Sequence, residues 1–172
     1  MRIDSGGPPL RGISESLRAR YGASGPPCTD ALLRAAGHEV RIKVLRAAQG
    51  GLEACVIPLP NGTFRFVCDD QAAPGEPPDL GLLQDPRRFR ISFRLAHELA
   101  HVAFSCVSFG MVRGPHNASP IEARCDAFAA LFLVGASDAL AAVDAGEAAV
   151  RSLAHQLDVP PRIIREAALA AA

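Results

Sequence analysis

The feature that most constrains this chain is the segment His97-Glu98-Leu99-Ala100-His101, an H-E-x-x-H pattern. Residues four apart lie on one face of a helix, so both imidazoles can reach a single metal ion. The glutamate between them stands where it can accept a proton from a water molecule. The pattern therefore predicts a helix with two metal ligands, and it requires a third ligand from elsewhere in the chain.

Glu122 is the best candidate for that third ligand. It starts an E-x-x-x-D spacing with Asp126, and residues at this spacing share a helix face. In this interpretation Glu122 binds the metal, while Asp126 holds a ligand histidine from behind and fixes its tautomer. A second interpretation competes, because Ser119-Pro120-Ile121-Glu122 is also a helix capping box. The H-E-x-x-H segment upstream favours ligation.

Two histidines, a glutamate ligand and one open position are typical of a catalytic zinc site. With the two histidines and Glu122 on the metal, Glu98 becomes the general base that activates water and later protonates a leaving amine. The chemistry that this arrangement predicts is zinc-dependent hydrolysis of a peptide bond. A fourth protein ligand, such as His116 or Cys125, would instead close the site and make the zinc structural.

Apolar periodicity and turn residues predict an α+β chain. Thr29 is expected to cap one helix, and Asp85 with Pro86 to begin the helix that carries the H-E-x-x-H segment. Gly135 is expected to end the helix that carries Glu122. Helices are predicted over residues 10–22, 29–36, 86–106, 120–133, 137–145, 147–157 and 161–170, and strands over 38–45, 51–57 and 63–69.

The last two predicted strands are separated by Asn61-Gly62, a hairpin pattern. A two-residue turn there would pair Cys55 with Cys68, but Pro58 would then occupy a hydrogen-bonded pair without an N–H to donate. A wider loop over residues 58–62 is equally compatible with the pattern. The sequence therefore leaves a contact between the two cysteines open.

The charge of the chain is balanced, with 18 Lys and Arg against 18 Asp and Glu. This balance argues against a dedicated nucleic-acid or membrane-surface protein, which would carry a basic excess. Arg90 and Arg94 share a helix face with the two histidines. We expect them on a solvated, charged face, and contact with an acidic substrate is the alternative.

Length and cysteine content bound the organisation of the chain. Its 172 residues suit one domain with a substantial core, expected over residues 10–172 behind a flexible arm of residues 1–9. The sequence contains neither an apolar run of transmembrane length nor a signal-peptide pattern, so we expect a cytoplasmic location. The five cysteines are odd in number and lack a C-x-x-C pair, which favours reduced thiols.

Three segments resemble the ImmA/IrrE family of zinc metallopeptidases. Residues 88–101 (RFRISFRLAHELAH) look like the family's R-F-x-x-A-H-E-x-x-H helix, and residues 122–129 (EARCDAFA) resemble its downstream E-x-x-A/C-N-x-F-A helix. Residues 150–159 are similar to a trailing helical unit of the family. The chain departs from the family pattern at Asp126, where Asn is usual, at residues 131–135 and at Pro160-Pro161.

The resemblance implies a gluzincin-type site, with Glu122 as third zinc ligand, in a zincin-like fold. That fold would pack a small mixed sheet on two metal-bearing helices, with residues 147–172 as a C-terminal helical extension. The implied substrate is a specific protein or peptide, often a helix-turn-helix repressor cleaved in stress response or transcription regulation. Two other functions stay open: a hydrolase that matures a product of a biosynthetic cluster, and a non-catalytic regulatory binding module that keeps the motif.

Overall fold

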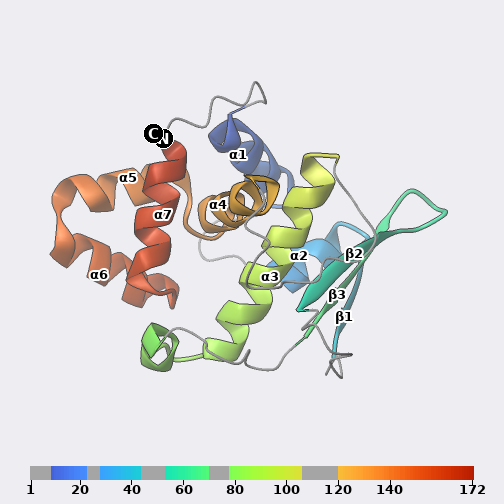
Figure 1. Cartoon of the computed structure of the whole chain (residues 1–172), viewed down its shortest axis with the longest axis horizontal. Helices are drawn as coiled ribbons and strands as arrows, with labels where there is room; N and C mark the ends of the chain where they lie inside the picture. Colours follow the sequence, from blue (N-terminus) through green and yellow to red (C-terminus); the bar gives the residue numbers. More distant parts are fainter. Residues whose placement is uncertain (1–8, 23–27, 44–52, 70–77, 106–119) are drawn as a thin grey trace.

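The computed structural model describes residues 9–22, 28–43, 53–69, 78–105 and 120–172. Within these ranges the protein is α+β, as predicted, with seven α-helices, a short 3-10 helix and one sheet (Figure 1). The helices are α1 (Leu10–Arg20), α2 (Thr29–Ala35), α3 (Pro86–Ala103), α4 (Pro120–Val134), α5 (Ala136–Ala145), α6 (Glu147–Leu157) and α7 (Pro161–Ala171), and the 3-10 helix is η1 (Pro78–Leu82).

The sheet has three strands and is mixed. Its central strand β3 (Phe64–Cys68) pairs in parallel with β1 (Glu39–Ile42) and antiparallel with β2 (Ala54–Pro58). Val56 and Phe66 are buried in the same cluster as Leu95 and Leu99 of α3. The sheet therefore packs against the helix that carries the H-E-x-x-H segment.

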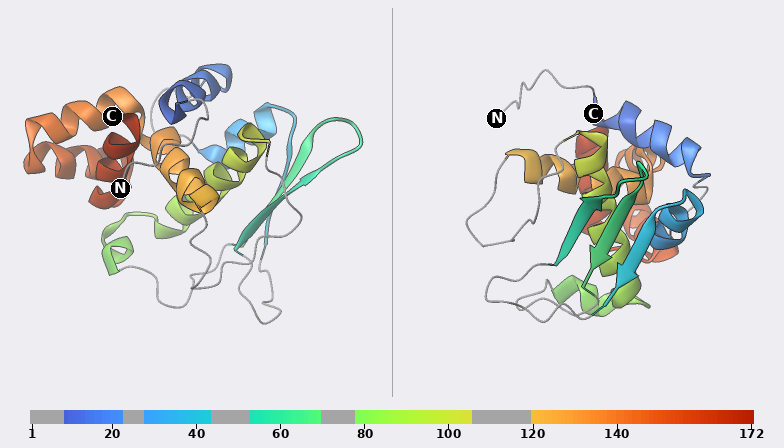
Figure 2. Two further views of the ribbon diagram at one scale, coloured as in Figure 1. Left: turned by 45° about the horizontal axis from the view of Figure 1, so that its top comes forward. Right: turned by 90° about the vertical axis from the view of Figure 1, so that its right-hand side faces the viewer.

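Helix α3 lies between the sheet and the C-terminal helices (Figures 1 and 2). Two buried clusters meet along α3 and α4. The sheet-side cluster contains Leu33, Val40, Val56, Phe66, Cys68, Ile91, Leu95, Ala96, Leu99, Ala100, Cys125, Phe128, Ala129 and Phe132. The C-terminal cluster contains Leu80, Phe89, Ala130, Leu131, Leu133, Val134, Ala136, Ala139, Ala142, Val150, Ala154, Val159, Ile163, Ile164, Ala167 and Ala168. Helix α4 belongs to both clusters, so its second half is buried on every side.

The β2–β3 hairpin uses the wider turn. Leu59 donates its N–H to the carbonyl of Thr63 at 2.9 Å, and Gly62 donates its N–H to the carbonyl of Leu59 at 3.1 Å. Pro60 and Asn61 therefore form the middle of the turn, and Gly62 takes the left-handed conformation with φ +79°. The two-residue turn was the wrong one of the two alternatives.

Pro58 gives the physical reason for this register. It pairs with Phe64, next to the hydrogen-bonded pair of Leu59 and Thr63. Hydrogen-bonded and non-hydrogen-bonded pairs alternate along antiparallel strands, so Pro58 needs no N–H in this position. The two-residue turn would have placed it at a hydrogen-bonded pair.

The start of α3 is capped as the sequence predicts. The Asp85 side chain accepts the N–H of Arg88 at 2.9 Å, and Pro86 takes the first helical position. The prediction for α2 was wrong by one residue, because Cys28 takes the cap position and Thr29 is already helical. Thr29 is fully buried, and its hydroxyl has no hydrogen-bond partner among the described residues, so it does not cap the helix.

Gly135 ends α4, as predicted, with φ +91°, a backbone conformation that glycine adopts without strain. The chain bends by 84° there between α4 and α5. Among the described residues, no single helix combines the length and the apolar character needed to cross a membrane, although α4 and α5 together pass that test as a bent pair.

Candidate metal centre

His97 and His101 form a buried pair in the second half of α3. Each residue is 3% exposed, and the ring centroids are 5.1 Å apart. The two Nε2 atoms lie 3.3 Å from each other. The spacing of the motif therefore places both imidazoles at one point, as the sequence predicts.

The first turn of α4 brings the Glu122 carboxylate to this pair. Its Oε2 atom lies 3.1 Å from Nε2 of His97, and its Oε1 atom lies 3.6 Å from Nε2 of His101. Ser119, which the capping-box interpretation of Glu122 needs, lies outside the described residues, as does His116. Glu122 thus faces the same side of the two rings that the histidines turn toward each other.

Asp126, one turn further along α4, lies behind the ring of His97. Its Oδ1 atom is 2.7 Å from Nδ1 of His97, and its side chain is 44% exposed. When Nδ1 carries the ring proton it donates to this carboxylate, which leaves the Nε2 lone pair directed at Glu122 and His101. The sequence interpretation has Asp126 hold a ligand histidine from behind, and the structure brings its carboxylate to the ring of His97.

Cys125 is the third side chain of metal-ligand type in the buried group. It is fully buried, and its Sγ atom lies 3.8 Å from Nδ1 of His101. One ligand atom from each of His97, His101 and Cys125 lies within 4.8 Å of the others. This group can hold a metal ion, and it makes the protein a candidate metal-binding protein.

The distances distinguish two sides of the histidine rings. Ligands about 2.0–2.1 Å from a tetrahedral ion lie about 3.3 Å apart. The Nε2 side has this spacing, with separations of 3.3, 3.1 and 3.6 Å among the two nitrogens and the Glu122 carboxylate. With both rings protonated on Nδ1, the three donor atoms would direct their lone pairs at one point. The donor set on the Nε2 side therefore fits a small cation.

Glu98 is buried in α3 with 5% exposure, and its carboxylate contributes to the raised pKa of two cysteines in the sheet. The pKa of Cys68 is raised to about 12, chiefly by burial, with a contribution from the neighbouring Glu98 carboxylate. Burial likewise raises the pKa of Cys55, and Glu98 adds to that shift.

Cys55 and Cys68 are both free thiols. Cys55 stands opposite Val67, while Cys68 stands opposite Ala54. Because successive side chains of a strand alternate between its faces, the two cysteines lie on opposite faces of the hairpin. The contact that the two-residue turn would have produced is absent from this register.

Arg94 has a role that the sequence did not reveal. It is buried, its Nε atom donates to Glu53 at 3.2 Å, and its Nη1 atom donates to the carbonyl of Asp69 at 2.8 Å. The expectation of a solvated face was therefore wrong for Arg94. Its two partners, Glu53 and Asp69, are 41 and 25 residues away along the chain, so no local pattern could have indicated them. Arg94 ties the open end of the β2–β3 hairpin to α3, one turn before His97.

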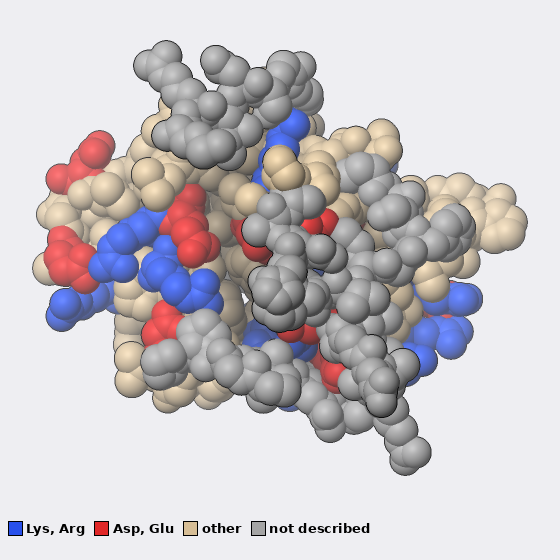
Figure 3. All heavy atoms as spheres, in the orientation of Figure 1, with Lys and Arg blue, Asp and Glu red and all other residues tan. Residues whose placement is uncertain are grey.

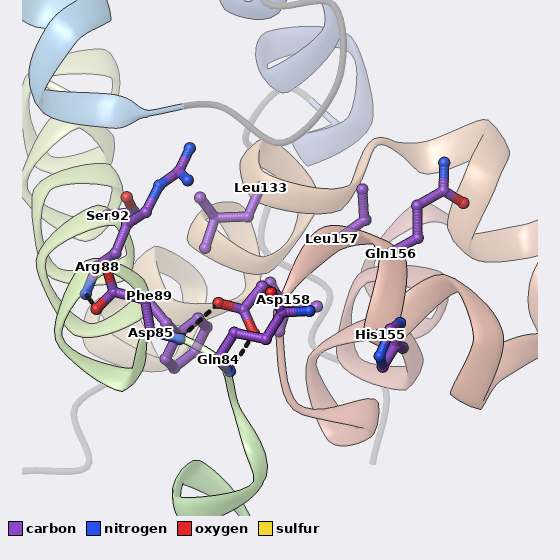
Figure 4. Close-up of a pocket in the computed structure, with 11 residues that line it drawn as sticks. Gln84, Asp85, Arg88, Phe89, Ser92, Leu133, His155, Gln156, Leu157 and Asp158 are labelled. Carbon is purple, nitrogen blue, oxygen red and sulfur yellow. Dashed lines mark hydrogen bonds between the residues drawn. The ribbon is translucent and has the colours of Figure 1, made fainter.

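A separate cavity of about 280 Å³ lies between the start of α3 and the end of α6 (Figure 4). At its edge, the Asp158 carboxylate accepts the N–H of Gln84 at 2.7 Å and the N–H of Asp85 at 2.9 Å. Arg88 and Leu133 contribute to the lining. These contacts fasten the first turn of α3 to the α6–α7 connection, at the end of α3 that is opposite the histidine pair.

The surface of the C-terminal helices carries interleaved charges of both signs (Figure 3). Arg165 of α7 pairs with Glu147 of α6 at 2.7 Å, and Arg162 of α7 pairs with Asp79 of η1 at 3.1 Å. These pairs join α6, α7 and η1 to one another, and as exposed ion pairs they add only modestly to stability.

No family model matches this chain, and no curated protein matches it. The resemblance to the ImmA/IrrE family therefore depends on the three sequence segments alone. The structure adds a small mixed sheet, a histidine pair on α3 and a buried group that can hold a metal ion.

Proposed function

We propose that the protein is a zinc-dependent metallopeptidase in which His97, His101 and Glu122 hold the ion. The observation that carries the proposal is the convergence of the two Nε2 atoms, 3.3 Å apart, with the Glu122 carboxylate at 3.1 and 3.6 Å. Two imidazoles and one carboxylate, with a fourth position left for water or substrate, form the donor set of catalytic zinc sites.

Glu122 is a better third ligand than Cys125 for a geometric reason. The Nε2 atom of His101 faces His97, whereas Cys125 lies on the Nδ1 side of the same ring. The two ring nitrogens point in divergent directions, so an ion bound through Nε2 lies on the side of the ring away from the Nδ1 contact with Cys125. Glu122 is on the Nε2 side with both histidines.

Zinc is the ion that we expect from this donor set, because buried imidazole and carboxylate ligands suit it well. When bound, the ion would supply Lewis acidity, lowering the pKa of water and polarising the scissile carbonyl. The chain's own residues must then orient the ligands and move the protons.

Glu98 is the residue that we assign to proton transfer. Its carboxylate accepts a proton from the attacking water and delivers it to the nitrogen of the leaving amine. Its burial beside His97 on the helix that carries both histidines supports this role. Asp126 accepts the Nδ1 proton of His97 and so keeps Nε2 of that ring unprotonated.

We propose a specific protein or peptide as the substrate. The resemblance to the ImmA/IrrE family makes helix-turn-helix repressors the first substrates to test. This part of the proposal is supported by the three sequence segments and not by any feature of the described surface.

The experiment is cleavage by the zinc-loaded protein and by its Glu98→Gln variant. A panel of helix-turn-helix repressors and a proteome-derived peptide library are incubated with each, and new N-termini are identified by mass spectrometry. Glu15→Gln, a change of the same kind at an exposed position of α1, is the matched control. We expect wild type and Glu15→Gln to cleave, and Glu98→Gln to bind zinc normally but to lose at least about 1000-fold in turnover, in keeping with removal of a general base.

Two results would contradict the proposal. Retained turnover in Glu98→Gln would remove the assigned base, and the absence of cleavage by zinc-loaded wild type would remove the peptidase activity. Capture of an uncleaved peptide equally by wild type and Glu98→Gln would point to a binding module that keeps the motif.

A further inference from the structure

We infer that Cys125 is a positioning residue for His101 and that it stays outside the ligand set of the metal. The inference rests on the proposed metal site and deepens it by assigning the second buried contact of the histidine pair. It concerns a side chain whose burial and thiol chemistry would otherwise make it a candidate ligand.

The contact that carries the inference is the one between Sγ of Cys125 and Nδ1 of His101, at 3.8 Å. Both residues are buried, so water does not compete for the ring nitrogen. Sulfur is a large, weak acceptor, and this separation is compatible with an N–H···S hydrogen bond. The thiol therefore lies where it can accept the Nδ1 proton of the ring.

This contact indicates which nitrogen of the His101 ring carries the proton. A neutral imidazole carries one proton, and binding a metal through Nε2 requires that proton to be on Nδ1. Nδ1–H of His101 donates to Sγ of Cys125, just as Nδ1–H of His97 donates to the carboxylate of Asp126. Each ligand histidine thus has its own partner on α4, and the two partners are consecutive residues.

The two partners differ in strength. The carboxylate contact to His97 is short, at 2.7 Å, and is assisted by charge, while the sulfur contact to His101 is long, at 3.8 Å. Partners of this kind orient ligand histidines, and their loss typically weakens metal binding by about 10–100-fold. For Cys125 we expect the lower end of this range, because the hydrogen bond is weak.

The first test is the absorption spectrum of the wild-type protein with Co²⁺ in place of zinc. A thiolate bound to Co²⁺ gives intense charge-transfer bands in the near ultraviolet, which imidazole and carboxylate ligands lack. We expect the visible bands of a tetrahedral Co²⁺ site without the thiolate bands. This measurement needs no variant, so it remains decisive even if substitutions at Cys125 prevent folding.

The second test compares zinc affinity among variants of two buried cysteines. Cys125→Ser keeps an acceptor for Nδ1–H and is expected within about 3-fold of wild type, whereas Cys125→Ala removes it and is expected to bind zinc about 10-fold more weakly. Cys68→Ala is the matched control, because Cys68 is equally buried in the same cluster and its thiol donates to the carbonyl of Asp69 at 3.3 Å. It is expected to leave zinc affinity unchanged.

The outcomes separate this inference from the proposed function. Thiolate bands in the Co²⁺ spectrum would make Cys125 a ligand and overturn the inference, while the metal site itself would stand. Equal zinc affinity in wild type and Cys125→Ala would also overturn it. Failure of the wild-type protein to bind either Co²⁺ or Zn²⁺ would instead overturn the proposed function.

Discussion

Helices α3 and α4 meet at the histidine pair, but they carry their polar side chains in different ways. Along α3, buried polar groups continue through most of the helix, namely Ser92, Arg94, His97, Glu98 and His101. In α4 the ionisable groups are confined to the first half, and the stretch from Phe128 to Val134 is buried and apolar. The two helices therefore contribute differently, since α3 carries both histidines and α4 brings Glu122 and Asp126 to them from an anchored apolar half.

This difference shows how the site is held in place. Buried polar groups are tolerated only when they have partners, and α3 finds them in the sheet and in α4. Arg94 reaches Glu53 and the carbonyl of Asp69, whereas His97 reaches Asp126. The apolar half of α4 lies in both buried clusters, so the first half projects from a rigid base. Rigid support of this kind is what a precise ligand geometry requires.

The largest expected effect tests whether the apolar half of α4 anchors the site. Phe128 is fully buried, with its ring 5.8 Å from that of Phe104 and 5.9 Å from that of Phe132. We expect Phe128→Ala to lower the free energy of unfolding by about 3–5 kcal/mol, because it leaves a cavity where the two clusters meet. Denaturant unfolding of the protein measures this directly.

Phe93 of α3 is the matched control for this prediction. It is only half-buried, and its ring contacts Phe89 at 5.8 Å between centroids. Phe93→Ala should cost about half as much, because less apolar surface is returned to water. Equal losses at the two positions would mean that α4 is no better anchored than α3.

A smaller effect is expected at Asp126, in the polar half of α4. We expect Asp126→Ala to weaken zinc binding by about 10–100-fold, since His97 loses the acceptor that orients it. Asp126→Asn keeps one oxygen and should fall between wild type and Asp126→Ala. Calorimetric zinc titration gives the affinities, and unfolding should change little because the side chain is 44% exposed. A large loss of stability with unchanged zinc affinity would mean that Asp126 stabilises the fold and does not orient His97.

The smallest effect is a difference in thiol reactivity. Cys68 and Cys125 are buried, and burial raises the pKa of Cys68 to about 12, so it stays protonated and enclosed at neutral pH. Cys28 and Cys55 are partly exposed, although burial also raises the pKa of each. Among the four cysteines that the structure describes, we expect a maleimide reagent under native conditions to modify Cys28 and Cys55 before Cys68 and Cys125, as resolved by peptide mass spectrometry. Early modification of Cys125 would contradict a closed contact between α3 and α4.

The sequence was most informative where the necessary contacts are local. The cap at Asp85, the break at Gly135 and the meeting of His97 with His101 depend on residues within a few positions of one another, and the structure has all three. The E-x-x-x-D spacing also indicated which face of α4 would turn toward the histidines, because that inference needs only helix geometry.

The features that the sequence could not supply depend on distant partners. Burial of Arg94 requires Glu53 and Asp69, which the hairpin brings to α3. The register of that hairpin was left open between two turns, and the one adopted frees Pro58 from a hydrogen-bonded pair. The contact of Cys125 with His101 likewise depends on how α4 is rotated against α3, which no pattern within either helix determines.

The central claim is that His97, His101 and Glu122 together hold one divalent ion. Its most direct test is zinc analysis and titration of the wild type beside Glu122→Gln and Glu122→Ala, with Glu15→Gln on α1 as the matched control. Loss of one of three protein ligands should cost more than loss of a supporting hydrogen bond, so we expect at least a roughly 100-fold weaker affinity in both Glu122 variants. Wild type and Glu15→Gln should each bind one zinc ion per chain. Unchanged stoichiometry and affinity in both Glu122 variants would contradict the account.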